Sequence, residues 1–270
     1  MRTWIAALLV AGWPLAAPAE EAAALHALTS ADETRGWEAV GRLNIADTSF
    51  CTGALIAPSL VLTAAHCLVD QRTGADIDPG ELTFLAGWRN GRAAAYRGVK
   101  RAMAHPDYVY EGENPMDRVA YDLALLELDQ PIRLPSIRPF DVGADPMRGD
   151  TVSIVSYAFD RSEAPSMQDA CLVLGRQPGV LVLTCAVDFG SSGAPIFAVK
   201  DGAAQIVSVV SAKAEMNDKR VALATQMTQP LTELQAAFAA GESPFQRVTP
   251  GPGASPTGKT GSAGAKFVKP

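Results

Sequence analysis

The sequence predicts an all-β fold, because its apolar residues fall mostly in short runs separated by turn residues. These runs hold five to eight residues each, which is typical of strands and too short for an average helix. Residues 229–240 differ, since Leu231 and Leu234 recur there at helical spacing and predict one amphipathic C-terminal helix. Many short strands in succession are typical of an antiparallel sandwich or barrel.

The expected strands form two groups on either side of a proline-rich segment. Pro131, Pro135 and Pro139 block a regular strand, so we expect the chain to cross there from one β half to the other. Before this segment, the expected strands cover residues 40–45, 51–57, 60–65, 82–88 and 123–129. After it, they cover residues 151–157, 171–175, 180–187, 194–199, 205–212 and 221–227.

Composition and charge limit the number of domains and the classes of partner that the protein can have. Its 270 residues are 48% hydrophobic, which is enough to bury the core of one large domain or two small ones. The net charge is −6 and the pI about 5.1, without a basic stripe, which argues against nucleic acid as a partner. Past the N-terminus, no stretch is long and apolar enough to span a membrane. We expect the mature protein to be a monomer without a membrane span.

The N-terminus has the features of a secretory signal peptide. Arg2 precedes an apolar stretch over residues 4–17, and Ala-Pro-Ala at 17–19 matches a cleavage site. A membrane anchor is the alternative, but the apolar stretch is short and Pro14 interrupts it. The sequence therefore predicts a signal peptide over residues 1–19 and a secreted or periplasmic protein.

Two further segments lie outside the predicted β region. Residues 20–36 are rich in alanine and polar residues without a strand pattern, and we expect a propeptide or an N-terminal arm. Residues 241–270 are rich in Gly, Pro, Ser and Thr without apolar periodicity, which predicts a disordered tail.

The four cysteines are Cys51, Cys67, Cys171 and Cys185. They contain no C-x-x-C pair, so the sequence does not favour a metal site. An even number of cysteines in an exported protein suggests two disulfides, for which three connectivities are possible. Sequential pairing closes two short loops, each worth about 3 kcal/mol in the loop-entropy model.

The segment VDFGSSGAPIF, residues 187–197, places Ser191 and Ser192 between two glycines. Such a segment is by itself typical of a turn. A serine hydroxyl becomes a useful nucleophile only when a base lies within hydrogen-bond reach, and a neutral histidine near pH 7 can be that base. A buried carboxylate can orient the histidine and stabilise its charged form.

His66 and Asp122 are the candidate partners of the serine. His66 follows the expected strand in LVLTAAHC, where small alanines allow a close turn, and Asp122 begins the apolar run YDLALLELD. A carboxylate at that position is costly to bury unless it is paired. The chain order of His66, Asp122 and Ser192 is the one found in catalytic triads built on β-barrels.

Four segments resemble those of the chymotrypsin-like, or trypsin-like, serine proteases. CTGALIAPSLVLTAAHC resembles the cysteine-to-histidine segment, and AHPDYVYEGENPMDRVAYDLALLELDQPI resembles the aspartate segment. GSSGAPIF is similar to a loosened form of the nucleophile loop, and IVSVVSA is similar to the strand that lines the primary specificity pocket. The resemblance covers roughly residues 37–240 and is of the secreted bacterial kind.

This resemblance implies two six-stranded antiparallel β-barrels followed by the C-terminal helix. The first barrel is expected over about residues 37–130, the second over 140–228 and the helix over 229–240. His66, Asp122 and Ser192 would be the triad, and the backbone N–H groups of Gly190 and Ser192 would form the oxyanion hole. The short loops that they close favour the pairs Cys51–Cys67 and Cys171–Cys185, and the first pair also matches the family. No cofactor is expected, because the sequence shows no metal cluster or phosphate-cradling loop.

Two departures from the family pattern concern activation and specificity. Ser191 stands where the family has an acidic residue that pairs with a newly cut N-terminus, so activation of that kind is not expected. Ala186 stands where a carboxylate is needed for cleavage after Arg or Lys, so a neutral residue is expected before the scissile bond, although Asp188 is close by. The residues expected to line the specificity pocket are Ala186, Val187, Ser208, Ser211 and Lys213.

The function expected from these residues is hydrolysis of protein or peptide substrates by a serine endopeptidase. An inactive protease-fold binding protein is the first alternative, because fold alone does not imply function. An esterase with the same triad is the second, although an α/β-hydrolase would need the order Ser, Asp, His.

Overall fold

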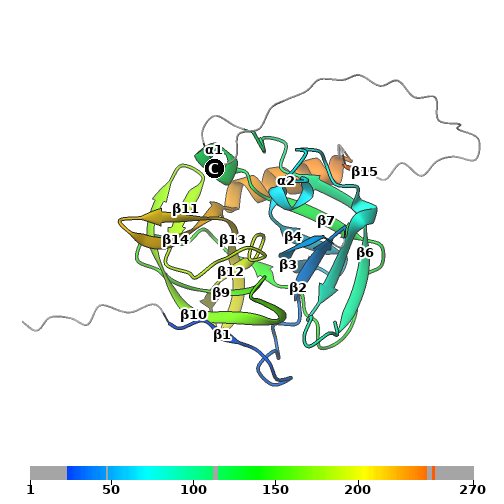
Figure 1. The fold of residues 1–270 in the computed structure, drawn as a ribbon, viewed down its shortest axis with the longest axis horizontal. Coiled ribbons are helices and arrows are strands. Elements are labelled where there is room, and N and C mark those ends of the chain that lie inside the picture. Colours follow the sequence, from blue (N-terminus) through cyan, green and yellow to red (C-terminus); the bar gives the residue numbers. More distant parts are fainter. Residues whose placement is uncertain (1–22, 47, 112–114, 242–244, 247–270) are drawn as a thin grey trace, which may run out of the picture.

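The computed structural model describes residues 23–46, 48–111, 115–241 and 245–246, most of which belong to two β-barrels that lie side by side (Figure 1). The predicted signal peptide and most of the predicted C-terminal tail lie outside these residues. Within the described part of the chain, no helix is long and apolar enough to cross a membrane.

The first barrel is an antiparallel ring in which β2 pairs with β3 and β5, and β6 closes the ring by pairing with β7. Its interior is filled by apolar residues such as Leu43, Phe84 and Leu125, none of which is exposed. The six strands of the ring are β2 (Val40–Ile45), β3 (Ser49–Ala57), β4 (Leu60–Thr63), β5 (Leu82–Ala86), β6 (Ala95–Ala104) and β7 (Ala124–Leu128).

The second barrel repeats this plan with a second antiparallel ring, closed by the pairing of β9 with β10. Its interior packs around residues such as Ile154, Leu181 and Ile196. The six strands of the ring are β9 (Thr151–Ala158), β10 (Arg161–Gln177), β11 (Val180–Leu183), β12 (Pro195–Lys200), β13 (Ala203–Met216) and β14 (Lys219–Gln226). The predicted fold class of two six-stranded barrels is therefore confirmed.

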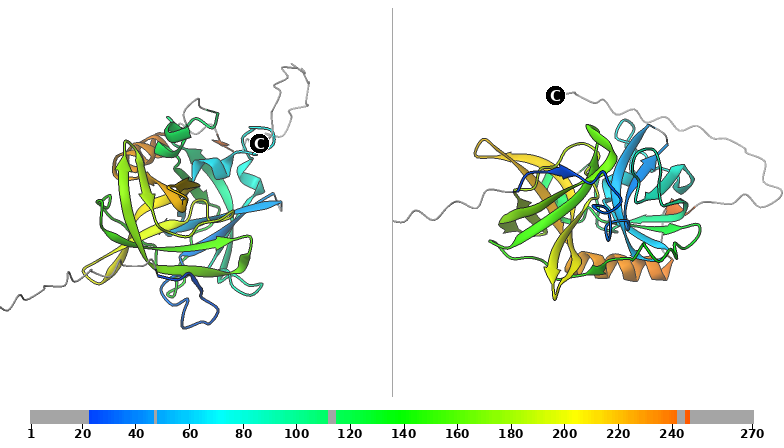
Figure 2. Two further views of the ribbon diagram at one scale, coloured as in Figure 1. Left: turned by 60° about the vertical axis from the view of Figure 1, so that its left-hand side comes forward. Right: turned by 90° about the horizontal axis from the view of Figure 1, so that it is seen from below.

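Short elements connect and cover the barrels. The helix α2 (Thr228–Ala240) lies against β6 and β7 of the first barrel, ends at Gly241 with φ 78°, and buries Leu231, Leu234 and Phe238, so the C-terminal helix is confirmed (Figure 2). The remaining helical elements are η1 (Ala65–Leu68), η2 (Pro79–Glu81) and α1 (Pro115–Ala120).

Three strands differ from the sequence-based expectation because the apolar signal is weak there. The strand β6 alternates apolar residues with charged ones such as Arg97 and Lys100, and it was not expected. The strand β10 begins ten residues before the expected 171–175, because irregularities in its pairing with β9 accommodate Pro165 within a polar sequence. The 20–36 segment, expected to lack strand structure, carries β1 (His26–Ala27), which pairs with β10.

Two more short strands join the sheets at their edges. The strand β8 (Asp141–Val142) pairs in parallel with β13. The strand β15 (Phe245–Gln246), within the segment expected to be a disordered tail, pairs with β6. Its partners, Arg101 and Ala102, lie outside the part of β6 that pairs with β5.

Candidate active site

His66 lies in the short helix η1, directly after β4. Ala64 and Ala65 are fully buried, and their small side chains allow the close turn between the two elements. The next residue, Cys67, forms a disulfide with Cys51 of β3, so the turn is tied covalently to the neighbouring strand. The imidazole is therefore held on a rigid part of the first barrel.

Asp122 precedes β7 and is 1% exposed. Its Oδ2 lies 2.7 Å from Nδ1 of His66, and its Oδ1 accepts a hydrogen bond from the His66 backbone N–H at 2.9 Å. Ser211 of β13 donates a further hydrogen bond to Oδ2. These bonds offset the desolvation of the buried carboxylate, and they fix the imidazole with Nε2 directed away from Asp122.

Ser192 lies in the turn between β11 and β12, and the backbone of this turn is bound on both sides. The Phe189 carbonyl oxygen accepts from the Phe159 N–H at 2.9 Å, and the Gly193 N–H donates to the Val210 carbonyl oxygen at 2.8 Å. The Ser192 carbonyl oxygen accepts from the Thr52 N–H at 2.8 Å. The turn therefore has little freedom to rearrange.

The N–H groups of Gly190 and Ser192 differ from their neighbours in this turn. Within the described part of the chain, neither of them donates a hydrogen bond. Gly190 has φ 94°, which turns its peptide relative to a normal strand, and a Cβ there would come within 2.4 Å of the Phe50 ring. Two free N–H groups in a fixed turn, next to a serine, are the arrangement that stabilises an oxyanion.

The hydroxyl of Ser192 and the ring of His66 line the same two cavities. Among the described residues no hydrogen bond joins these two side chains. Such a bond is often long before a substrate binds, so its absence does not count against a nucleophile and base pair.

The nucleophile cavity, of about 340 Å³, is the one that contains both Asp122 and Ser192. Val187, Ser211 and Lys213, which were predicted to line the specificity pocket, do line this cavity. Ser208 does not, because its side chain is fully buried and donates to the Thr225 carbonyl oxygen at 2.7 Å.

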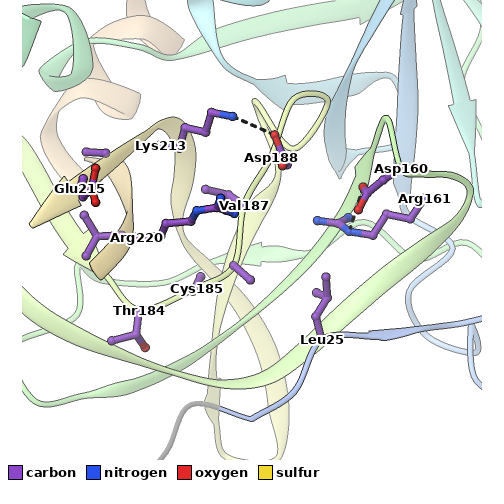
Figure 3. A pocket seen from close by; sticks show the side chains of 13 residues that line it. Leu25, Asp160, Arg161, Thr184, Cys185, Val187, Asp188, Lys213, Glu215 and Arg220 are labelled. Carbon is purple, nitrogen blue, oxygen red and sulfur yellow. Dashed lines mark hydrogen bonds and ion pairs between the residues drawn. The ribbon is translucent and has the colours of Figure 1, made fainter. Parts of the chain in front are cut away.

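The outer cavity, of about 630 Å³, shares a wall with the nucleophile cavity and includes the predicted pocket residue Ala186 (Figure 3). Lys213 and Asp188 line both cavities, and their ion pair spans 2.9 Å at the shared wall. The ammonium also lies 3.9 Å from the centre of the Phe189 ring. The bond from Lys213 is the main reason that the pKa of Asp188 is lowered.

The aromatic cavity, of about 760 Å³, is lined by Ser192, His66 and the disulfide-bonded Cys51 and Cys67. Phe50 and Phe159 stack at 4.9 Å on its wall, and Phe189 is largely exposed at the same cavity. The exposed rings of Phe159 and Phe189 give this cavity an apolar surface.

Cys51, His66 and Cys67 place metal-ligand atoms within 4.8 Å of one another. The two sulfur atoms are joined in a disulfide, so they offer no thiolate to a metal ion. The second disulfide, Cys171–Cys185, links β10 to the segment after β11, and both bonds follow the expected pairing.

Sequence reasoning missed two residues that contact the turn. Thr52 was included in a motif only as a neighbour of Cys51, and its hydroxyl donates to the Gly190 carbonyl oxygen. Arg161 lies in a segment without strand pattern, and its guanidinium donates to the Ser191 hydroxyl. Neither contact leaves a local sequence signal, because the partners are distant in the chain.

Comparison with known proteins identifies relatives for most of the chain. A family model described as Trypsin matches residues 29–232. The chain is 30% identical to trypsin of Simulium vittatum over 188 residues, which are 60% of this chain and 69% of that protein. It is 28% identical to glutamyl endopeptidase of Bacillus licheniformis over 148 residues, which are 54% of this chain and 45% of that protein.

A third relative, the suppressor of tumorigenicity 14 protein homolog of Bos taurus, is 34% identical over 98 residues. These residues are 33% of this chain and 10% of that protein, so the chain spans a small part of the bovine protein.

Two solved structures share the fold. A Glu endopeptidase in complex with MPD has a TM-score of 0.65 and 18% identity, and the match covers 79% of this chain and 97% of that chain. A scabies mite inactivated protease paralogue has a TM-score of 0.59 and 16% identity, with 77% and 94% covered. At these identities the likeness concerns the fold alone.

Proposed function

Because the chain belongs to the trypsin family, we propose that it is an exported serine endopeptidase that works through an acyl-enzyme intermediate. His66, Asp122 and Ser192 are the catalytic residues of this proposal, and the N–H groups of Gly190 and Ser192 form its oxyanion hole. The substrate is a protein or a peptide.

The first half of the proposed reaction forms the acyl-enzyme. Nε2 of His66 takes the proton of the Ser192 hydroxyl while Oγ attacks the carbonyl carbon of the scissile peptide bond. The carbonyl oxygen becomes an oxyanion that accepts hydrogen bonds from the two free N–H groups. The C–N bond then breaks, and His66 gives its proton to the leaving nitrogen.

The second half repeats these steps with water in place of the serine. His66 takes a proton from water, and the resulting hydroxide attacks the acyl carbon. When the ester bond breaks, Ser192 recovers its proton from His66. Asp122 carries its negative charge throughout and stabilises the imidazolium that forms in each half.

One observation carries this proposal. A buried carboxylate lies 2.7 Å from the imidazole, and the imidazole shares a cavity with a serine whose turn leaves two N–H groups free. A chain that used this turn only to connect two strands would gain nothing from a buried charge or from unpaired N–H groups, which both cost free energy.

An active-site-directed fluorophosphonate probe tests the proposal directly. The folded wild-type protein should bind one probe covalently at Ser192, and Ser192→Ala should bind none. Ser162→Ala is a matched control, because it removes a hydroxyl outside the cavities around Ser192 and should label like the wild type. Absence of labelling in correctly folded wild type would reject the enzyme.

That negative result is the outcome expected of the second candidate, a binding protein on the protease fold. Ser191, which stands where the family has an acidic residue, favours this candidate, and one solved protein of similar fold is described as an inactivated protease paralogue. The presence of all three triad residues favours the enzyme.

Export is part of the proposal and is supported by the two disulfides, which persist in oxidising compartments. The intact mass of the protein recovered from its producing cell tests it. Export predicts a chain that begins near residue 20 and contains no free thiol.

A further inference from the structure

Arg161 is a partly buried cation beside the turn that carries Ser192. Its side chain is 14% exposed, at the first position of β10. The carboxylate paired with it, that of Asp160, is 75% exposed, and the two charged groups lie 3.9 Å apart, so this pairing is weak. Burial lowers the pKa of the Arg161 guanidinium, because the charged form loses hydration. A buried charge of this kind persists where its N–H groups have fixed partners.

The guanidinium connects β9 to the Ser192 turn. Nη1 donates to the carbonyl oxygen and to the hydroxyl of Ser156, both at 3.2 Å, and Nη2 donates to the Ser191 hydroxyl at 3.3 Å. Ser191 is fully buried, and its hydroxyl also accepts from the Asp188 N–H and donates to the Tyr157 carbonyl oxygen. Figure 3 shows Arg161 extending toward the segment that carries Asp188.

We propose that Arg161 is a positioning residue for the oxyanion hole. Its guanidinium holds the Ser191 hydroxyl, and Ser191 lies between Gly190 and Ser192, whose N–H groups form the proposed oxyanion hole. The Ser191 hydroxyl and N–H are both bonded to the Asp188 backbone, so holding Ser191 fixes the shape of the turn that carries these two N–H groups. The partners of Arg161 in this contact belong to the chain itself, so the turn has its working shape without a newly cut N-terminus. This inference rests on the proposed function, because the two N–H groups matter for turnover only if an oxyanion forms.

Kinetics of Arg161 variants provide the first test. Arg161→Met keeps an unbranched apolar stem but removes the guanidinium and its donors, and kcat should fall by about 10²-fold with little change in KM, as expected for misplaced oxyanion donors. Ser191→Ala should reproduce part of this loss. Arg161→Lys, which keeps the charge and a donor, should retain more activity than Arg161→Met.

Chemical rescue and a matched arginine separate positioning from general destabilisation. Added guanidinium ion should restore part of the kcat of Arg161→Ala, because Arg161 lines the open outer cavity. Arg101→Met is the control, since Arg101 is a similarly buried arginine that pairs with Glu127 in the first barrel. The proposal is overturned if Arg161→Met turns over like the wild type, or if Arg101→Met lowers kcat equally and guanidinium does not rescue Arg161→Ala.

Hydrogen exchange tests the same contact without any turnover. In the Ser192→Ala background, Arg161→Met should speed exchange of the bonded amides of residues 188–193, and Arg101→Met should not. Unchanged exchange of this segment would overturn the role of Arg161. If the exchange changes but wild-type protein fails to react with the fluorophosphonate, the holding role is supported and the proposed enzymatic function is rejected.

Discussion

The hydroxyl of Thr52 donates a hydrogen bond to the Gly190 carbonyl oxygen at 2.9 Å, across 138 positions of sequence. The same hydroxyl accepts a bond from the Tyr157 N–H at 3.0 Å. Thr52 belongs to β3 of the first barrel, while both partners belong to the second. One side chain therefore fixes the oxyanion turn relative to the barrel that carries His66.

Thr52→Val should lower kcat by about 10- to 100-fold, because it removes this hydroxyl at nearly constant volume and frees the Gly190 peptide to rotate. The buried partners left unpaired should also lower the free energy of unfolding by about 1–3 kcal/mol. Thr34→Val is the control, since Thr34 is a buried threonine bonded to the Ser30 carbonyl oxygen, away from the site. Equal kcat values for the two variants at saturating substrate would contradict the prediction.

Asp122→Asn should preserve the fold and nearly abolish turnover. The amide can still accept the bond from the His66 N–H, but it favours the imidazole tautomer that cannot take the serine proton. Triads of this kind lose about 10⁴ in kcat from the change. Circular dichroism and thermal unfolding should report folded protein, and folded protein with near-normal kcat would exclude Asp122 from the triad.

The two disulfides should differ in their effect on catalysis. Removing either one, as Cys51→Ala/Cys67→Ala or Cys171→Ala/Cys185→Ala, should lower the free energy of unfolding by about 3 kcal/mol, because the loops are of similar length. Only the first pair should also lower kcat strongly, since Cys67 adjoins His66 in η1. Denaturant titration and kcat measured well below the unfolding transition check both parts. Equal kcat in the two double variants would show that the bond does not hold His66.

Most of the fold could be predicted from the sequence, and the exceptions have a physical reason. A strand with a strong apolar signal, such as LALLELD at residues 123–129, is recognisable because most of its side chains are apolar and buried. The strand β6 buries Val99 and Met103, but charged residues interrupt its apolar pattern, and Pro165 interrupts the first part of β10. Backbone hydrogen bonds have no side-chain signature, so only the structure reveals these segments.

The candidate site also contains residues that the sequence indicates and residues that only the structure reveals. His66, Asp122 and Ser192 lie in short segments with characteristic neighbours, so each could be proposed from the sequence. Thr52 and Arg161 act through hydrogen bonds to residues far along the chain, and nothing in their own segments indicates those bonds. Ser208 shows the opposite case, a residue that was expected in the pocket and is not there. Ser208 and Ser211 lie on the same strand, and the strand pattern does not indicate that only Ser211 lines the cavity.

The Lys213–Asp188 ion pair should determine which side chain is accepted before the scissile bond. The nucleophile cavity is small and partly apolar, with Val210 and Ala212 on its wall, and both members of the pair also line the outer cavity. Wild-type protein should therefore prefer neutral side chains of small to medium size, since an Arg or Lys would find Asp188 already paired.

Breaking the pair from either side should shift this preference in opposite directions. Lys213→Ala leaves Asp188 free and should improve cleavage after Arg and Lys, while Asp188→Ala leaves Lys213 free and should improve cleavage after Asp and Glu. Both side chains are 48% exposed, so solvent screens the charges and each shift should be about fivefold in kcat/KM, or about 1 kcal/mol. A peptide library varied at that single position measures both. Strong wild-type preference for Arg or Lys would show that Asp188 is available to the substrate despite Lys213, and identical preferences in the two variants would show that neither charge faces it.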